Sequence, residues 1–493
     1  MKRKEINSKT CIYLAITGLL STVVLRPAPG LATEVDGVLN TRIGNAGYVQ
    51  VENSLDAWSR LYKLKNDTYV QFGSRLDKKS HTCLGMAAQP LLTNITNRGS
   101  SFNRSFGSRI LEKVNTRNQG SFSSVTQDKK GLIFLAGGVS DVGQVDSPGG
   151  GFGCTYDNNR IFITKLTDTG NPVLEFGARF QVPGTESDGI LYLDEVLGES
   201  TTTGYITSIT NISAKVLAVT IIGNASFDLL YLNSVDGSIN RNYGIDGKLS
   251  LNIPSLNIFE SVKTEDGIVL AGDLINNSNN DWFLRWAVTE INNKGIETSR
   301  FKGQNNFQYS SGYKEGVYWT PVFKEPYIYF VGGVYTGSVY EIKVMRIDQN
   351  GKLDANYGGY LRSQLLDLGV NPISYGSGEF VVDSDGRILV TIGTDSHVVS
   401  DQRNSAVIRL DTTGKIDTSF GSTGKIWVDF DYQAGIYPVK DNNFLIYGTQ
   451  YSPSYCSSNG MFCGLNQTQL AHFSQLNLPR KTQDQGKNER TKG

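Results

Sequence analysis

The sequence predicts an all-β protein, a closed β-propeller of about seven four-stranded blades, on the strength of three observations. A turn motif with two glycines recurs roughly every 56 to 70 residues along the chain. Short runs rich in Val, Ile, Leu, Tyr and Phe, bounded by Asp, Asn and Gly, lie between its copies. The first and last repeats are both incomplete, and each has the part that the other lacks.

The turn motif is clearest in DTTGKIDTSFGSTGKIWV, which begins at Asp411. Two of its glycines lie seven residues apart, and Phe, Tyr or Ile precedes the second glycine in each copy. Five copies have such a pair: Gly37 and Gly44, Gly170 and Gly177, Gly237 and Gly244, Gly351 and Gly358, and Gly414 and Gly421. Two degenerate copies, from Arg98 and from Asn293, bring the number to seven. Because glycine adopts positive φ without steric cost, we expect these glycines in tight turns.

The segments between the turns predict about four strands per repeat. SDGRILVTIG, which begins at Ser384, and SAVIRLDTTG, which begins at Ser405, have the pattern most clearly. Each repeat offers one strand after the second glycine, one before the DG turn, one after it, and one that ends in RLD or its equivalent. Four short antiparallel strands in a repeat of this size are typical of a propeller blade.

The repeat resembles a known bacterial family. The pattern D-G-x-I-L-V-x-x-G, followed by A-V-x-R-L-D-x-x-G-x-x-D-x-S-F-G-x-x-G-K, is similar to the delta-60 repeat family. The resemblance is close at residues 383–428 and looser elsewhere, and with the degenerate copies it covers nearly the whole mature chain. It implies a propeller-like repeat architecture and no particular reaction.

The two ends of the repeat array favour a closed ring. The N-terminal segment, Asp36–Val51, holds a turn copy and one strand, whereas the last strands, which end at Asn477, lack a following turn copy. We therefore expect the N-terminal strand to complete the last blade, because this pairing hides two sheet edges that would otherwise invite aggregation. An open solenoid, which also repeats, is the alternative.

The N-terminus has the layout of a secretory signal peptide. Basic residues precede an uncharged apolar run, Cys11–Leu25, and Gly30 and Ala32 stand at the −3 and −1 positions of a cut after Ala32. An uncleaved anchor is the alternative, but the run is shorter than the ~20 residues that a membrane span needs. We expect residues 1–32 to be the signal peptide, residues 33–477 the propeller, and 478–493 a disordered polar and basic tail. The protein is then secreted or periplasmic.

The charge balance excludes an obvious nucleic-acid binder. The chain has 47 basic and 47 acidic residues, and no clustered basic face is visible. No second long apolar run follows the first, so we expect no membrane span in the mature chain. The expected partner is an unknown extracellular ligand, either a glycan or a protein.

Three repeats that would be neighbours in the closed ring have long insertions. The segments at 74–89, 139–159 and 449–467 are long where other repeats are short, and we expect them to form neighbouring loops on one propeller face. They hold all the mature cysteines: Cys83, Cys154, Cys456 and Cys463. In an exported protein an even number of cysteines favours disulfides, and we expect Cys456 with Cys463 and Cys83 with Cys154. A zinc site is the rival interpretation, but the spacing does not suit one.

Two function classes stay open. No Ser-His-Asp or metal-ligand motif is visible, so we predict a non-enzymatic binding, adhesion or scaffold module without a cofactor, whose site is the loop patch or the mouth of the central channel. The alternative is a polysaccharide hydrolase or lyase that uses two carboxylates in the channel. Asp348 with Asn350, and Asp383 with Asp385, hint at calcium ligands, but ordinary turn chemistry explains them better.

Overall fold

The structure, a computed structural model, describes most residues between 38 and 474. The residues outside the description are 1–37, 475–493, the longer internal segments 40–47, 299–314, 394–404 and 451–466, and several shorter gaps. The chain divides into Met1–Glu34 and Val35–Gly493, and every described residue belongs to the second unit. The expected signal peptide at 1–32 and tail at 478–493 therefore lie outside the described residues and stay predictions. None of the described helices is long and apolar enough to cross a membrane.

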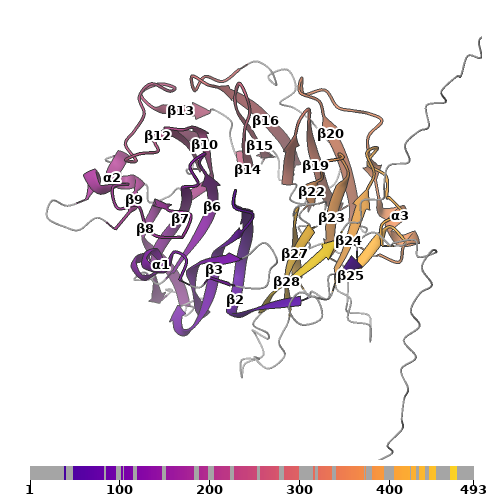
Figure 1. Cartoon of the computed structure of the whole chain (residues 1–493), viewed down its shortest axis with the longest axis horizontal. Coiled ribbons are helices and arrows are strands. Elements are labelled where there is room, and N and C mark those ends of the chain that lie inside the picture. Colours follow the sequence, from indigo (N-terminus) through magenta and orange to yellow (C-terminus); the bar gives the residue numbers. More distant parts are fainter. Residues whose placement is uncertain are drawn as a thin grey trace, which may run out of the picture. The chain divides into compact units, whose positions relative to one another are not determined.

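The unit Val35–Gly493 is an all-β propeller of six sheets arranged around a common centre (Figure 1). Consecutive strands pair antiparallel within each sheet. One sheet consists of β6 (Gln119–Gln127), β7 (Ile133–Asp146), β8 (Phe152–Leu166) and β9 (Ile190–Tyr192). The next consists of β10 (Tyr205–Ser213), β11 (Val216–Ile222), β12 (Phe227–Asn233) and β13 (Lys248–Leu251).

Three further sheets follow in chain order. The first consists of β14 (Leu256–Lys263), β15 (Gly267–Asn276) and β16 (Phe283–Asn292). The second consists of β17 (Glu315–Gly316), β18 (Thr320–Lys324), β19 (Tyr327–Tyr335), β20 (Tyr340–Ile347) and β21 (Gly359–Tyr360). The third consists of β22 (Phe380–Val382), β23 (Ile388–Gly393), β24 (Ser405–Leu410) and β25 (Lys425–Val428).

The sixth sheet joins the two ends of the repeat array. Its eight strands are β26 (Tyr432–Pro438), β27 (Phe444–Gln450), β28 (Gln467–Ser474), β1 (Val38–Leu39), β2 (Tyr48–Lys63), β3 (Tyr69–Thr82), β4 (Gly85–Ile95) and β5 (Phe102–Asn103). Strand β2 pairs with β28 as far as Leu55 and with β3 from Asp56 onward. Six sheets are one fewer than the roughly seven blades that the repeat count predicts. The described strands therefore support a propeller of six sheets, and they do not support the predictions of seven blades and of closure.

The apolar core lies between successive sheets. Every residue of β24 is buried, because neighbouring sheets cover both faces of the strand. One cluster joins Tyr329 and Val344 to Ile388 and Ile408 of the following sheet. A strand covered on both faces needs a continuous apolar run rather than an alternating one, which explains the short Val-, Ile- and Leu-rich runs of the repeats.

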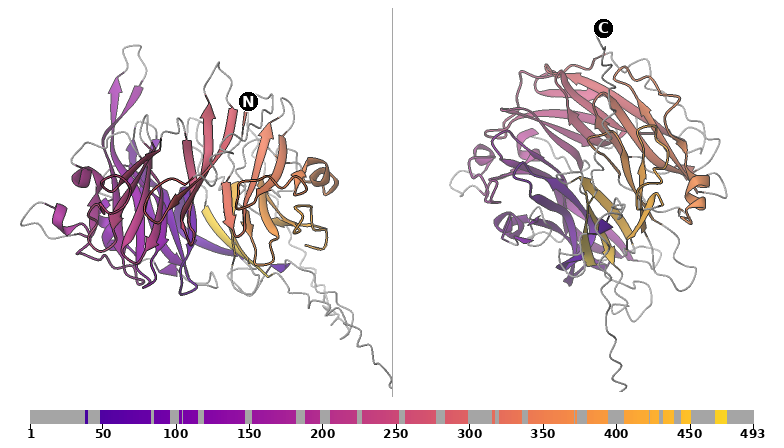
Figure 2. Two further views of the ribbon diagram at one scale, coloured as in Figure 1. Left: turned by 90° about the horizontal axis from the view of Figure 1, so that it is seen from above. Right: turned by 45° about the vertical axis from the view of Figure 1, so that its right-hand side comes forward.

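Two of the three expected loops are strands. Strands β3 and β4 continue as a hairpin through residues 74–89, with Ser74 opposite Pro90 and Thr82 opposite Gly85. Strands β7 and β8 do the same within 139–159, and their hairpin extends beyond the rest of the sheet (Figure 2). The prediction of loops was wrong here, because two long segments of similar length satisfy their backbone groups best by pairing with each other. Of the third insertion, residues 451–466 lie outside the described part.

A short helix replaces one of the expected strands. The structure has α1 (Ser108–Val114), α2 (Leu193–Leu197), α3 (Arg362–Asp367) and a 3-10 turn (Ala178–Phe180). Helix α1 lies where the repeat predicts a strand after the second glycine, and its buried Ile110 and Val114 are four residues apart on one helix face. Helical spacing of the apolar residues overrides the repeat pattern at this place. Helix α3, with its buried Leu365, follows the expected strand, which is the short β21.

The turn copies of successive sheets contact one another through glycine. The N–H of a motif's second glycine donates to a carbonyl at the first glycine of the next copy, or at the residue before it. These bonds run from Gly107 to Gly170 at 3.1 Å, from Gly177 to Asp236 at 3.1 Å, from Gly244 to Lys294 at 3.0 Å, and from Gly358 to Thr413 at 2.9 Å. The repeat motif is therefore the contact between neighbouring sheets as well as a turn within one.

Glycine is required at these contacts by space and by backbone conformation. A Cβ atom added to Gly414 would lie 2.7 Å from both the Cα and the N of Gly358, closer than real Cβ contacts come. Positive φ is confirmed at all eight described motif glycines, which are Gly170, Gly177, Gly237, Gly244, Gly351, Gly358, Gly414 and Gly421. Gly37 and Gly44 lie outside the described residues.

We predict that Gly414→Ala lowers the free energy of unfolding by about 3 kcal/mol, since alanine is strained at φ +81° and its methyl group collides with Gly358. Urea denaturation of the purified variant measures the loss. Gly386→Ala is the matched control, because Gly386 has the same φ but its added Cβ would have no neighbour closer than 4.0 Å. We expect about 1 kcal/mol for this control. Equal losses in the two variants would contradict the role of the contact between sheets.

Candidate functional site

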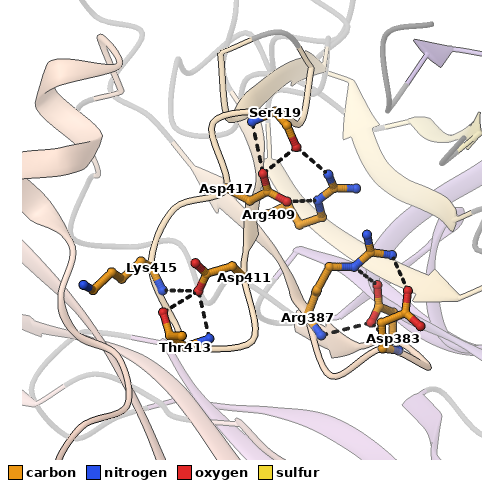
Figure 3. Close-up of polar contacts among 9 residues, drawn as sticks. Asp383, Arg387, Arg409, Asp411, Thr413, Lys415, Asp417 and Ser419 are labelled. Atoms are coloured by element: carbon orange, nitrogen blue, oxygen red, sulfur yellow. Dashed lines mark hydrogen bonds and ion pairs between the residues drawn. The ribbon is translucent and has the colours of Figure 1, made fainter. Parts of the chain in front are cut away.

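The turn after β24 is closed by an aspartate side chain (Figure 3). The Asp411 carboxylate accepts hydrogen bonds from the N–H of Thr413 at 2.8 Å, from its hydroxyl at 2.7 Å and from the N–H of Lys415 at 3.1 Å. Asp383 accepts from the N–H groups of Asp385 and Arg387 in the same manner in the turn before β23. Aspartate favours turns for this reason, since its side chain satisfies the backbone two to four residues on.

A second aspartate in the same motif holds a buried arginine (Figure 3). The side chain of Arg409 is only 2% exposed, and its Nε lies 2.9 Å from Asp417 Oδ2. Ser419 completes the group, because its hydroxyl and N–H both donate to Asp417 while Arg409 donates to that hydroxyl. The guanidinium also lies 4.8 Å from the ring centroid of Phe420, which precedes the motif's second glycine. A buried cation with these partners is a structural element of the turn.

The same two positions are paired in other repeats. Arg346 and Asp354 form the equivalent ion pair at 2.7 Å, with the arginine 18% exposed. In the repeat before, Thr298 donates to the carboxylate of buried Glu290 at 3.0 Å. The side chains at these two positions differ between repeats, but each of these repeats keeps a polar contact between them. We therefore assign the polar pairs to the scaffold.

The environment of these aspartates favours their charged form. The pKa of Asp417 lies below the ordinary value of 3.8, because hydrogen bonds from Ser419 and the charge of Arg409 outweigh burial, which alone would raise it. The pKa of Asp411 is lowered in the same way, with its bonds to Thr413 and Lys415 outweighing burial. Both carboxylates therefore stabilise the fold only while they are ionised.

The turns interpreted as possible calcium ligands serve as ordinary turns. The Asp348 carboxylate accepts from the N–H groups of Asn350 and Lys352, as Asp383 does in its own turn. Within the part of the chain that the structure describes, no group of three or more His, Cys, Asp and Glu side chains gathers as a metal site would require.

The cysteine predictions stay untested. Cys83, Cys456 and Cys463 lie outside the described residues. Cys154 lies in β8, where its Cα is paired with that of Gln144, and its side chain is not among those described. The expected pairs Cys83–Cys154 and Cys456–Cys463 remain predictions.

A cavity of about 640 Å³ lies among the innermost strands. Apart from Phe72 of β3, its walls come from β2, β6, β10, β14, β18, β22 and β26, or from residues shortly after them. These strands surround the centre of the arrangement in Figure 1. The volume falls in the range of about 300 to 1,000 Å³ that is common for small-molecule sites.

The cavity has two chemically different sides. Strands β2 to β14 supply eight hydroxyl side chains: Ser123, Ser124, Thr126, Thr207, Ser208, Thr210, Ser213 and Ser261. The same strands and their turns supply four cations: Arg60, Lys65, Lys129 and Lys263. Strands β18, β22 and β26 supply apolar and aromatic residues: Val322, Phe380, Val381, Ile436 and Tyr437. The hydroxyls and cations are confined to β2 to β14 and their turns, whereas apolar residues occur all around the cavity, since these strands also supply Leu61, Tyr62, Val125, Ile209 and Val262.

Several of the hydroxyls also join neighbouring inner strands. Ser124 of β6 accepts a hydrogen bond from the backbone N–H of Ile209 at 3.0 Å, and its own O–H remains a donor. Thr210 of β10 donates to the carbonyl of Ser261 in β14 at 3.1 Å, and Ser208 shares a hydrogen bond with the hydroxyl of Ser261. These bonds fix the positions of the hydroxyls before any ligand arrives.

Two of the cations lie at one rim. The Nζ of Lys65 donates to the carbonyl of Asp128 at 2.7 Å, and its backbone N–H donates to the side-chain oxygen of Gln127 at 2.8 Å. Lys129 is the residue after Asp128, and both lysines are exposed. Lys263 ends β14 and is also exposed. The mouth of the cavity is therefore lined with positive charge.

Asp128 is the single carboxylate among the described residues that line the cavity. It is 5% exposed, and it accepts hydrogen bonds from the N–H groups of Lys130 and Leu132 at 2.8 and 2.9 Å. A glycoside hydrolase needs two carboxyl groups on either side of the scissile bond. The described lining does not supply such a pair, so the hydrolase alternative finds no support at this cavity.

Sequence reasoning missed the cavity residues. The signal was present in SFSSVT at 121–126 and ITSIT at 206–210, where Ser and Thr interrupt runs that are otherwise apolar. It also missed the pair of Arg409 and Asp417, eight residues apart, although Arg346 and Asp354 repeat the spacing.

The comparisons with known proteins concern the fold. A family model described as "Domain of unknown function (DUF5122) beta-propeller" matches residues 384–420, which include the pair of Arg409 and Asp417. The crystal structure of a protein of unknown function from Dyadobacter fermentans is similar over 87% of this chain and 100% of that one, with 11% identity and a TM-score of 0.42. A glycosyl hydrolase from Bacteroides ovatus is similar over 64% of this chain and 90% of that one, with 13% identity and a TM-score of 0.29. No curated protein matches this sequence.

We predict that Asp417→Asn lowers the free energy of unfolding by about 2 kcal/mol, because it leaves the Arg409 guanidinium buried without a counter-charge. The matched control is Asp354→Asn, whose arginine partner is 18% exposed and can turn to water. For that variant we expect a loss within the ~1 kcal/mol that is usual for solvent-accessible ion pairs. Urea denaturation compares the two, and a larger loss for Asp354→Asn would contradict the assignment.

The lowered pKa values of Asp411 and Asp417 set the sign of the pH dependence. A carboxyl whose pKa is lower in the folded state stabilises the fold above its unfolded value, and this contribution is lost as the pH falls through the folded-state value. We expect the free energy of unfolding to drop below about pH 4, and to drop less steeply in Asp417→Asn. Denaturation at a series of pH values measures both curves, and parallel curves would show that Asp417 does not contribute.

Proposed function

We propose that this protein is a non-enzymatic binding module whose ligand occupies the cavity at the centre of the propeller. The observation that carries the proposal is the lining, which brings eight hydroxyls and four cations together on strands β2 to β14. The hydroxyl and cationic side chains of the lining can form directional hydrogen bonds with a polar ligand. The apolar residues around the cavity exclude water from that ligand.

This proposal places the site at the channel rather than at the three insertions. The described parts of two insertions form hairpins whose backbone groups are paired with each other. A backbone paired in this way offers few free partners to a ligand. The cavity instead holds side chains from several sheets around one space, and ligand sites favour such enclosed places.

We also propose that the eight-stranded sheet comprises two blades, so that seven blades close into a ring. The change of partner within β2 after Leu55 supports this division. An apolar cluster that joins Leu61 and Tyr69 to Leu445 and Tyr447 supports closure. So does the hydrogen bond of 3.2 Å from the N–H of Leu61 to the Tyr437 hydroxyl, which links β2 to β26. A crystal structure with a gap between β2 and β26 would contradict closure.

We further propose that the repeats are of the delta-60 type and that the mature protein is exported with two disulfides. The family match at 384–420 lies within the segment 383–428 that carries the resemblance. The division of the chain after Glu34 lies close to the expected cleavage site after Ala32.

Intact mass under non-reducing conditions tests the export prediction. We expect the protein recovered from the cell envelope or medium to begin at Thr33 and to be four hydrogen atoms lighter than its fully reduced form, one hydrogen atom for each cysteine oxidised in that compartment. Peptide mapping then distinguishes the pair of Cys456 and Cys463 from other pairings. An intact N-terminus or four free thiols would contradict this proposal.

We predict that a broad glycan array detects binding to the purified mature protein, and that Lys263→Trp weakens it about tenfold or more, because an indole at this exposed position blocks the mouth of the cavity. Lys130→Trp is the matched control, since Lys130 is exposed beside Lys129 but does not line the cavity. Circular dichroism verifies that both variants fold.

A reducing-end assay on each bound glycan separates binding from hydrolysis. Binding without new reducing ends, lost only in Lys263→Trp, would support the proposal. New reducing ends would overturn the non-enzymatic part. Equal loss in both tryptophan variants would move the site away from the cavity.

A further inference from the structure

We propose that the ligand of the cavity is an acidic oligosaccharide, whose carboxylates lie at the lysine rim and whose sugar rings lie between the hydroxyl side and the apolar side. This inference rests on the proposed function, because it names the ligand class for the same cavity. It is drawn from the charge, the hydrogen-bonding groups and the apolar surface of the lining, which each restrict the ligand independently.

The charge of the lining requires an anion. The lining residues include four cations, Arg60, Lys65, Lys129 and Lys263, and one carboxylate, Asp128. That carboxylate is already engaged by two backbone N–H groups of its own turn. Lys129 and Lys263 end exposed at the mouth, so a ligand carboxylate can reach either ammonium group from solvent.

The neutral polar groups require a ligand with many hydroxyls. A hydroxyl side chain both donates and accepts, which matches the same property of a sugar hydroxyl. Ser124 retains its own proton as a donor after accepting from Ile209. The side-chain nitrogen of Asn211, another lining residue, is buried and has no hydrogen-bond partner. A donor of this kind gains most from a ligand oxygen, since leaving it unpaired costs free energy.

The apolar side excludes a simple inorganic anion as the best occupant. Val322 and Val381 are half-buried on β18 and β22, around the centre from the hydroxyl-bearing strands. Tyr437 adds an aromatic ring beside them. Sugar rings present C–H faces that pack on such surfaces, whereas sulfate and phosphate have no apolar face to bury.

The size of the cavity agrees with a short oligomer. At about 640 Å³ it is too large for a single small ion and falls within the range of about 300 to 1,000 Å³ for organic ligands. An amphipathic anion such as a fatty acid would use the apolar side and the lysines but offer no acceptor to the Ser124 hydroxyl or to the Asn211 side-chain nitrogen. An acidic saccharide uses all three surfaces.

Isothermal titration calorimetry of the mature protein tests the ligand class with two matched probes. Trigalacturonic acid and the corresponding galactose trisaccharide differ only in the carboxylate at C6 of each ring. We expect the acidic trimer to bind about tenfold tighter or more at low ionic strength, and to lose most of this preference in ~0.5 M NaCl because salt screens exposed charges. Inorganic sulfate serves as the third probe, and we expect it to bind more weakly than the acidic trimer.

Single charge removals at the rim locate the interaction. Lys129→Gln and Lys263→Gln should each weaken binding of the acidic trimer about threefold to tenfold, and leave the neutral trimer unaffected. Lys130→Gln, at the neighbouring exposed lysine that does not line the cavity, is the control and should have no effect.

The outcomes separate the ligand class from the proposed function. If the neutral trimer binds as tightly and the glutamine variants change nothing, the acidic class is wrong while binding in the cavity stands. If sulfate binds as tightly as the acidic trimer, the site recognises a bare anion and the saccharide inference is overturned. If neither trimer binds, the inference is overturned, and the Lys263→Trp comparison on the glycan array decides separately whether the cavity binds anything.

Discussion

The contact between glycines of successive turn copies is the constraint on which the propeller depends. Each turn within one sheet is also the surface against which the next sheet is placed, as in the close approach of Gly414 to Gly358. A side chain at Gly414 would collide with the backbone of Gly358, so backbone atoms limit how closely these two turns approach. Repeats that differ in almost every other residue can therefore keep the same spacing.

The separation between neighbouring sheets determines which residues the strands can hold. Sheets held at a fixed separation bury both faces of their central strands, and β24 is buried along its whole length. Polar groups that enter this layer must bring their own partners, as Arg409 does with Asp417 and Ser419. The equivalent positions hold Glu290 with Thr298 in another repeat. Burial at these positions therefore requires two side chains that hydrogen-bond to each other, whichever charge they carry.

The sequence predicts the fold where short motifs determine the backbone. The motif glycines, the DG turns and the apolar strands are all visible in the letters, because each depends on residues a few positions apart. The hairpins within 74–89 and 139–159 were predicted to be loops, since pairing between two weakly patterned segments leaves little local signal. Helix α1 was missed because Ile110 and Val114 follow helical spacing inside a strand-like repeat. The cavity could not be predicted, because its lining comes together from strands more than 300 residues apart, such as those of Leu61 and Tyr437.

The polar character of the cavity has a structural origin that precedes any ligand. The innermost strand of each sheet is an edge strand, and its free N–H groups need partners that no further strand provides. Hydroxyls of the neighbouring inner strand supply them, as Ser124 does for Ile209 and Tyr437 for Leu61. A hydroxyl that accepts such a bond keeps its own proton, so the groups that close the edge also point a donor at the cavity. The glycine contacts lie in the turns and the hydroxyls on the inner strands. Side chains on the inner strands can therefore change without disturbing the glycine contacts between the sheets.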